Sequence, residues 1–160
     1  METGLEPVVF VGGAFDEIDR ICTELRKDGI MGIGLPYLPG HTPRMTYLRE
    51  EIVYDVEKML GPPKLPVYSA LTVDLFPSDP AGIRELLMAN LDHPVHFWQI
   101  NRRLYDDGAR IFIQAGCVTL ASNIETLLDA DDIASVAVDV ESRDPVTQLA
   151  HLISTVFTAG

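Results

Sequence analysis

The chain has 160 residues, of which 47% are hydrophobic and 22% are charged, a composition typical of a globular domain or of part of one. Its 12 Lys and Arg residues against 24 Asp and Glu residues give a net charge of −12, which argues against nucleic acid or an anionic membrane as partner. No apolar run reaches the roughly 18 residues of a membrane span, the N-terminus has no basic signal region, and two cysteines, Cys22 and Cys117, give no disulfide framework. We therefore expect a cytoplasmic protein.

Apolar runs alternate along the chain with segments that carry apolar residues at helical spacing. The runs predict strands at residues 7–11, 30–35, 65–71, 109–114 and 133–140. The helical spacing, with capping residues and glycine or proline stops, predicts helices at residues 14–28, 42–60, 80–91, 95–107, 119–128 and 145–157. Strands separated by helices predict an α/β fold with parallel strand pairing.

His41 is the first candidate for chemistry. It stands between the stiff loop of residues 36–40, which contains two prolines and a glycine, and a helix start at Thr42 and Pro43. This placement leaves the imidazole able to face a cleft, where it could act as an acid or a base. A histidine in such a loop is also often structural, so the residues alone leave both interpretations open.

Other motifs are weaker. His93 and His96 have a spacing that metal ligands sometimes use, but Pro94 intervenes and no third ligand is nearby, so we predict no metal site. The Gly12-Gly13 pair stands between a predicted strand and helix, where it could bind phosphate or form a tight turn.

Several segments in fixed order resemble one known family. The loop at His41 ends in His41-Thr42-Pro43-Arg44-Met45. It is followed by LPVYSALT at residues 65–72, LLMANLDHPVHF at residues 86–97 and LYDDGARIFIQAG at residues 104–116. With the closing strand and helix of residues 136–160, this order resembles the acyltransferase domains of type I polyketide synthases and the related malonyl-CoA:acyl carrier protein transacylases.

The resemblance implies transfer of a malonyl-type acyl group from coenzyme A to the phosphopantetheine thiol of an acyl carrier protein. It also implies a serine nucleophile and a histidine that acts as general base and then general acid. His41 matches that histidine, and the backbone carbonyl of Asn90 matches the group that orients it. Leu38, Pro39 and Gly40 match the loop that varies with the acyl unit, although their sequence is neither of the two common versions. No bound cofactor is implied, because acyl-CoA is the substrate and the phosphopantetheine belongs to the acceptor.

The resemblance covers the C-terminal half of such a domain. Residues 1–40 are expected to be the trailing part of a ferredoxin-like small subdomain, and residues 41–160 the C-terminal part of the large α/β subdomain. No Gly-His-Ser-x-Gly nucleophile elbow occurs in the sequence, so we expect the chain by itself to be inactive. The missing N-terminal half or neighbouring synthase domains are then expected partners.

Two alternatives stay open. The chain could be a non-catalytic module that docks a carrier protein or complements the missing half structurally. It could also be a thioesterase-like hydrolase in which His41 activates water. Because dividing an α/β domain leaves apolar faces and sheet edges uncovered, we further expect self-association or a second polypeptide over those surfaces.

Overall fold

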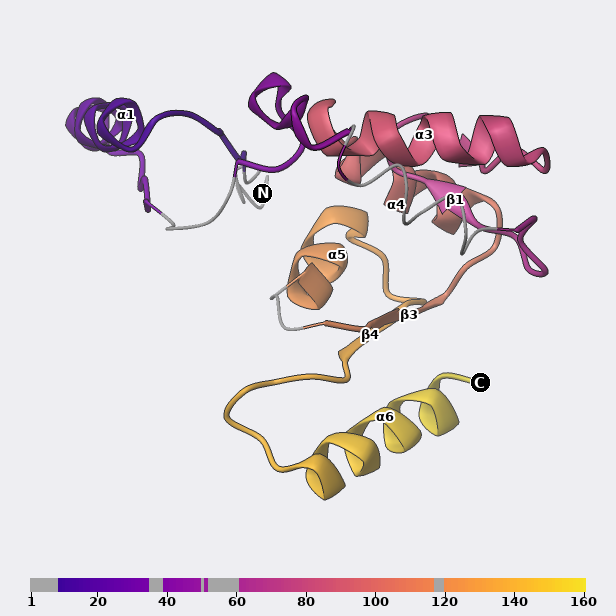
Figure 1. The fold of residues 1–160 in the computed structure, drawn as a ribbon. Coiled ribbons are helices and arrows are strands. Elements are labelled where there is room, and N and C mark those ends of the chain that lie inside the picture. Colours follow the sequence, from indigo (N-terminus) through magenta and orange to yellow (C-terminus); the bar gives the residue numbers. More distant parts are fainter. Residues whose placement is uncertain (1–8, 35–38, 50, 52–60, 117–119) are drawn as a thin grey trace. The chain divides into compact units, whose positions relative to one another are not determined.

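The structure is a computed structural model, and it describes residues 9–34, 39–49, 51, 61–116 and 120–160 (Figure 1). Its alternating helices and strands confirm the predicted α/β class. The elements are α1 (Phe15–Lys27), the 3-10 helix η1 (Pro43–Met45), β1 (Tyr68–Ser69), β2 (Asp74–Leu75), α3 (Pro80–Asp92), α4 (Phe97–Asp106), β3 (Ile111–Gln114), α5 (Leu120–Leu128), β4 (Ala134–Ala137) and α6 (Pro145–Ala159).

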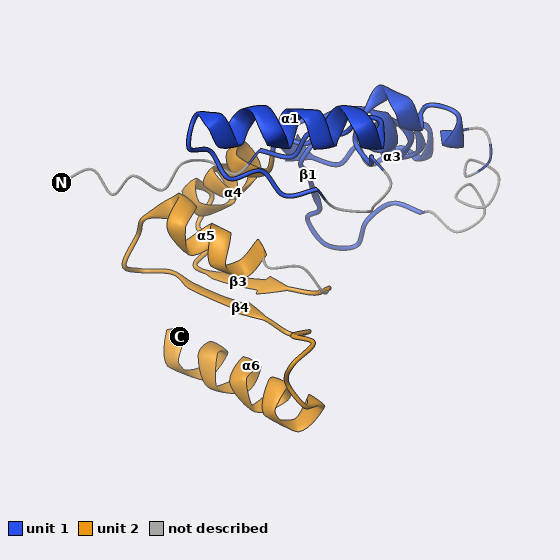
Figure 2. Cartoon of the chain, turned by 90° about the vertical axis from the view of Figure 1, so that its left-hand side faces the viewer, with its two compact units in different colours: residues 1–96 blue, residues 97–160 orange. Residues whose placement is uncertain are grey.

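By their internal contacts the residues form two compact units, residues 1–96 and residues 97–160 (Figure 2). This division separates groups of residues that pack among themselves. The subdomain boundary expected after residue 40 is a division of another kind, and it stays a prediction.

Helix α1 of the first unit forms where the sequence predicts it. The Glu17 carboxylate accepts a hydrogen bond of 3.1 Å from the backbone N–H of Ala14, which stabilises the helix start. The helix ends before Gly29, whose φ of 77° lies in the left-handed region that favours glycine. The expected glycine stop is therefore confirmed.

Helix α3, also in the first unit, begins at a capping residue and ends before a proline. The Asp79 carboxylate accepts a hydrogen bond of 2.7 Å from the backbone N–H of Gly82, and Pro80 occupies the first helical position. Pro94 cannot continue the helix and favours an extended residue before it, which is the conformation of His93. Local sequence thus fixes both ends of α3 within one residue of the prediction.

The strand predicted at residues 65–71 is much shorter in the structure. Only Tyr68 and Ser69 form β1, and they pair antiparallel with β2, a strand that was not predicted. The backbone N–H of Val73 donates to the Ser69 carbonyl at 2.8 Å, which closes a turn straight after the first strand. The turn ends β1 early, because a chain that reverses direction cannot extend the strand.

Two other predicted strands are wrong over their described residues. Residues 9–11 and 30–34 form no strand, and the rest of both predictions lies outside the described residues. Val9, Phe10 and Met31 are 74%, 72% and 83% exposed. A strand needs a neighbour to satisfy its backbone N–H and C=O groups, and no described segment pairs with either stretch.

The predicted helix at residues 42–60 is confirmed only in part. Thr42 leads into η1, a single 3-10 turn with Pro43 at its start, and not directly into an α-helix. Residues 50 and 52–60 lie outside the described residues. Met45, the last residue of η1, is buried and anchors this turn.

The second unit is a parallel α/β layer structure. Strands β3 and β4 pair in parallel, with Phe112 opposite Ser135 and Ile113 opposite Val136. Helix α5 packs against both strands, and α6 packs against β4 from the opposite side of the sheet (Figures 1 and 2). The parallel pairing expected for this part of the chain is confirmed.

The core of the second unit lies between α5 and the sheet. Phe112 of β3 and Ile124 and Leu128 of α5 are its buried members. Leu128 is only 2% exposed. The partly buried apolar side chains of α4, including Phe97 and Leu104, pack against this cluster. Helix α4 is therefore part of this core and does not depend on the first unit for burial.

Helix α6 has a second apolar face that the described residues do not cover. Five exposed apolar side chains recur at spacings of three or four residues with one adjacent pair, which places them along one side of the helix. They are Val146, Leu149, Ile153, Val156 and Phe157, and Phe157 is 84% exposed. We call these five residues the α6 stripe. Among the described residues, no helix has the length and apolar character needed to cross a membrane.

Candidate active site

His41 has a backbone conformation that few residues other than glycine adopt. Its φ is 60°, in the left-handed region, where a non-glycine residue costs on the order of 1 kcal/mol. Its backbone N–H donates to the carbonyl of Leu91 at 2.9 Å. This bond to α3 holds the residue in place, and such strain is common at functional sites.

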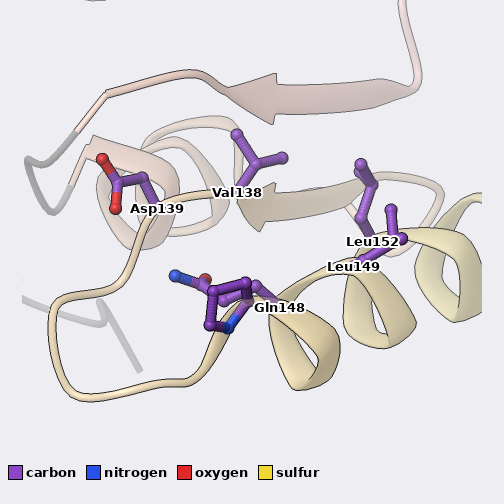
Figure 3. Close-up of a pocket in the computed structure, with 6 residues that line it drawn as sticks. Val138, Asp139, Gln148, Leu149 and Leu152 are labelled. Carbon is purple, nitrogen blue, oxygen red and sulfur yellow. The ribbon is translucent and has the colours of Figure 1, made fainter.

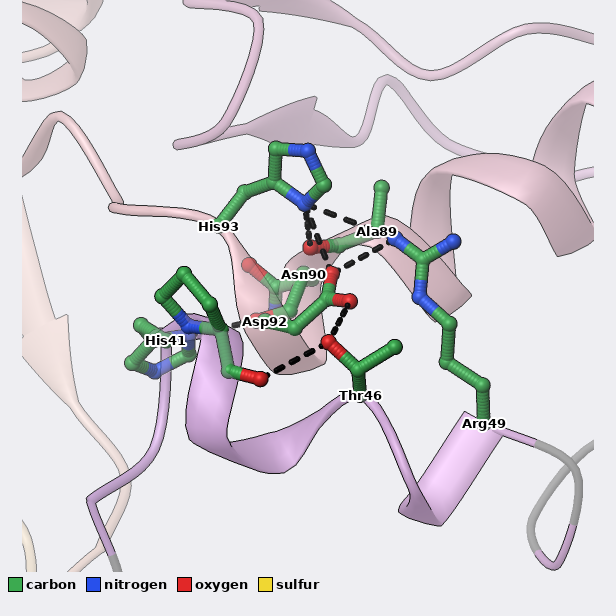
Figure 4. Close-up of polar contacts among 8 residues, drawn as sticks. His41, Thr46, Arg49, Ala89, Asn90, Asp92 and His93 are labelled. Carbon is green, nitrogen blue, oxygen red and sulfur yellow. Dashed lines mark hydrogen bonds and ion pairs between the residues drawn. The ribbon is translucent and has the colours of Figure 1, made fainter.

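The imidazole of His41 is held by the same helical turn (Figure 4). Its Nδ1 lies 2.6 Å from the backbone carbonyl oxygen of Asn90. A carbonyl oxygen only accepts, so Nδ1 carries the hydrogen and donates it. In the neutral ring, Nε2 is then left with a lone pair and can accept a proton. His41 is exposed, so Nε2 is accessible.

The end of α3 supplies acceptors suited to this task. The last four carbonyl groups of a helix have no donor within the helix, and those of Asn90 and Leu91 both belong to this turn. His41 takes both of them, one with its backbone and one with its ring. The partial negative charge of a helix C-terminus also favours the positive charge that an imidazole gains when it accepts a proton.

Asp92, the last residue of α3, forms a second polar cluster beside His41 (Figure 4). Its carboxylate accepts hydrogen bonds from Thr46 Oγ1 at 2.9 Å, from the Arg49 guanidinium at 2.5 Å and from His93 Nδ1 at 2.6 Å. The side chain is buried, with 6% of its surface exposed. The hydrogen bond from Arg49 is the main reason that the pKa of Asp92 falls from its ordinary value of 3.8 to about 2.

His93 is committed to the Asp92 cluster. Its Nδ1 lies 2.6 Å from the Asp92 carboxylate and 3.1 Å from the Ala89 carbonyl oxygen, so Nδ1 carries a hydrogen. Among the described residues, no group of three or more His, Cys, Asp or Glu side chains could hold a metal ion. The His93 and His96 pair is therefore not part of a described metal cluster.

The predicted loop before His41 is described in part. Leu38 lies outside the described residues, whereas Pro39 and Gly40 lead directly into His41. The Pro39 carbonyl accepts a hydrogen bond of 2.6 Å from Thr42 Oγ1, which closes a tight turn around His41. The loop geometry thus adds to the fixed position of the imidazole.

Gly12 has a structural explanation in the same place. A Cβ atom added to Gly12 would lie 2.7 Å from the Thr42 methyl group and 2.9 Å from Pro39 Cβ. Only glycine allows this close approach to the turn that carries His41. Of the two interpretations of Gly12-Gly13, the structure supports close packing.

Sequence reasoning missed the Asp92 cluster. One signal was present, because a carboxylate at the C-terminus of a helix meets the negative end of the helix dipole and needs a compensating partner. The partners Thr46 and Arg49 lie 46 and 43 residues away in sequence, so no local pattern could name them.

The described residues also form a cavity of about 250 Å³ between the end of β4 and the start of α6 (Figure 3). Val138, Leu149 and Leu152 give it an apolar lining. Gln148, which is buried, also lines it, and its side-chain oxygen has no described partner. No histidine, cysteine, serine or lysine lines this cavity, so it offers no group for nucleophilic or base chemistry.

Comparison with known proteins identifies the fold. The acyltransferase domain from module 8 of the salinomycin polyketide synthase matches with a TM-score of 0.76 and 18% identity, covering 91% of this chain and 35% of that domain. FabD from Acinetobacter baumannii matches with a TM-score of 0.63 and 21% identity, covering 87% of this chain and 44% of FabD. The chain has the acyltransferase fold. The expected resemblance is confirmed at this level, and the covered shares agree with a C-terminal half.

One curated relative agrees with this fold. The 5-methyl-1-naphthoate synthase of Streptomyces sahachiroi is 30% identical over 149 residues, which make up 89% of this chain and 8% of that synthase. The chain thus spans less than half of the solved acyltransferase structures it matches and a small part of the synthase. No family model matches the sequence.

Proposed function

We propose that this chain carries the histidine of an acyltransferase active site, with His41 as general base and then general acid. The observation that carries the proposal is the hydrogen bond from His41 Nδ1 to the Asn90 carbonyl, in a chain with the acyltransferase fold. This bond leaves Nε2 free to take a proton. The orienting role of the Asn90 carbonyl is part of the same proposal.

The proposed reaction moves a malonyl-type acyl group from coenzyme A to the phosphopantetheine thiol of an acyl carrier protein. A serine oxygen attacks the thioester carbon while His41 Nε2 takes the serine proton. The carbon–sulfur bond breaks, and His41 gives that proton to the departing coenzyme A sulfur. In the second half, His41 takes the proton of the carrier thiol as its sulfur attacks the acyl-serine, and returns the proton to the serine oxygen.

We place the serine outside these 160 residues. No Gly-His-Ser-x-Gly sequence occurs in the chain, and Ser69, the one buried serine among the described residues, accepts from the backbone N–H of Leu71 in a turn. The matched acyltransferase structures are more than twice as long as the part that this chain covers. The nucleophile then comes from another segment of the same polypeptide or from a second one.

The same missing part is the partner we assign to the α6 stripe. The stripe is apolar and exposed, which is unfavourable for a surface that faces water permanently. The length of the fold that lies outside the chain supports a polypeptide partner of that origin. In isolation, the chain should self-associate through such surfaces; binding the serine-bearing part should suppress this association.

The test combines the chain with a polypeptide that carries the Gly-His-Ser-x-Gly half of an acyltransferase. Malonyl-CoA and a phosphopantetheine-bearing carrier protein are added, and the malonyl carrier is measured by mass spectrometry. His41→Ala should lower kcat about 10²-fold to 10⁴-fold, the range typical of a general base. His151→Ala is the matched control, because His151 is an exposed histidine of α6; it should leave kcat unchanged.

Other outcomes would support the alternatives. Equal transfer by the wild type and the His41→Ala variant would leave the chain as a non-catalytic, complementing module. Hydrolysis of malonyl-CoA by the chain alone, lost in His41→Ala, would identify a hydrolase that activates water. Transfer by the chain alone would contradict the need for an external serine.

A further inference from the structure

We infer that Asp92 is a positioning residue for His41, and that it acts by clamping the last turn of α3 to the segment that begins with His41. The inference rests on the proposed function of His41, and it adds a residue that touches neither substrate nor the reacting atoms. Asp92 lies in the turn whose carbonyl groups hold the imidazole (Figure 4).

The first step concerns what His41 depends on. Both of its printed hydrogen bonds go to α3, from Nδ1 to the Asn90 carbonyl at 2.6 Å and from the backbone N–H to the Leu91 carbonyl at 2.9 Å. The imidazole is exposed, so packing contributes little to its orientation. Any shift of residues 90 and 91 relative to residue 41 therefore moves or releases the ring.

The second step concerns what fixes that distance. Asp92 follows Asn90 and Leu91 directly, and its two carboxylate oxygens bind Thr46 and Arg49, five and eight residues after His41. The segment of residues 41–49 is thus attached to the end of α3 at its beginning by the His41 bonds and further along by Asp92. Two separated attachments prevent the segment from pivoting about either one.

The third step concerns the cost of this arrangement. A buried carboxylate at the negative end of a helix is unfavourable unless it is paired and hydrogen-bonded. Asp92 meets both conditions, since Arg49 supplies the opposite charge and Thr46 and His93 supply further donors. A neutral residue here would avoid the desolvation cost but could not hold Arg49 and Thr46 together. The clamp is the property that distinguishes Asp92 from such a residue.

The test compares three variants in the chain combined with its serine-bearing partner. Asp92→Asn keeps the shape and the acceptor for Thr46 but loses the charge that holds Arg49, and Thr46→Val removes one donor with little change of shape. Asp79→Asn is the matched control, because it makes the same change at the other end of α3 and asparagine caps helices as well as aspartate. Thermal melts establish that each variant is folded.

The decisive readout is the tautomer of His41, recorded by ¹⁵N-correlated NMR of the labelled protein and assigned by the signals lost in His41→Gln. We expect the hydrogen on Nδ1 in the wild type and in Asp79→Asn, and a mixture of the two tautomers in Asp92→Asn and Thr46→Val. We also expect kcat to fall on the order of 10-fold to 100-fold in Asp92→Asn with an unchanged KM for malonyl-CoA, as a misplaced catalytic group would give.

A wild-type tautomer and a wild-type kcat in folded Asp92→Asn and Thr46→Val would overturn the inference. If Asp92→Asn fails to fold, Thr46→Val alone decides in the same way. The NMR signal needs no acyl transfer, so it separates the two proposals. A tautomer that changes with Asp92, together with transfer that is insensitive to His41→Ala, would support the clamp and contradict the proposed function.

Discussion

His41 Nδ1 and the Asn90 carbonyl oxygen lie 2.6 Å apart, although 49 residues separate the two in sequence. The acceptor is a backbone atom, so its chemistry does not depend on which side chain stands at position 90. What matters is that α3 ends there and leaves a carbonyl without a helical donor. The precision of the contact depends on the ends of α3 and on the residues that hold it, and four predictions test that arrangement and the second unit.

The stability contribution of Asp92 should depend on pH. Its pKa is about 2 in the folded protein and 3.8 when unperturbed, so between these values the unfolded chain binds a proton that the folded chain does not. The contribution is therefore fully present above about pH 4 and is lost as the pH falls towards about 2. Urea unfolding at a series of pH values should show a deficit in Asp92→Asn that is largest near neutrality and shrinks below pH 4.

The comparison with Asp92→Asn isolates this residue. Asp132 and Asp144 also have lowered pKa values, through hydrogen bonds from Tyr105 and Thr147, but they are unchanged in both proteins and cancel in the difference. A deficit that stays constant from pH 7 to pH 2 would contradict the ionised, bonded carboxylate that the structure shows.

Tyr105 should ionise at a higher pH than an ordinary tyrosine. Its hydroxyl donates a hydrogen bond of 3.0 Å to Asp132, and this bond to a carboxylate raises the pKa of Tyr105 above its ordinary value of 10.0. An ultraviolet absorbance titration should show a late phase that Tyr105→Phe removes. Asp132→Asn should move that phase towards lower pH. A titration of Asp132→Asn that overlays the wild type would show that the carboxylate is not the cause.

Truncation of Leu128 should destabilise the second unit strongly. Its side chain is 2% exposed within the cluster with Phe112 and Ile124, so Leu128→Ala removes apolar contacts and leaves a cavity. We expect a loss of about 3 kcal/mol in the free energy of unfolding, measured by urea denaturation. Leu65→Ala is the matched control, since Leu65 is 77% exposed and should cost far less. Equal losses in the two variants would contradict the assigned core.

The cap of α3 should contribute measurably to stability. Asp79→Ala removes the acceptor for the Gly82 N–H and should lower the free energy of unfolding by about 1 kcal/mol, whereas Asp79→Asn should be nearly neutral. Thermal or urea melts of the three proteins measure this. If Asp79→Asn is as unstable as Asp79→Ala, the carboxylate acts through its charge and not as a cap.

The local sequence determined the helices well, and the physical reason is that helix signals are short-range. Pro80 and Asp79 mark the start of α3, Gly29 marks the end of α1, and both helices form where these residues predict. Strand predictions were less successful, because a strand is stable only when another segment pairs with it. Ile113 and Val136 find each other across the parallel pair, whereas Val9 and Met31 belong to apolar runs without a described partner strand.

The candidate site divides in the same way. The order of segments, and the resemblance it carries, was enough to single out His41 and to name Asn90 as the position of its acceptor. The orientation of the ring and the cluster of Asp92, Thr46 and Arg49 were decided only in the tertiary structure. Hydrogen bonds and ion pairs between residues more than 40 positions apart depend on how α3 and the His41 segment meet in space, and no local pattern contains that information.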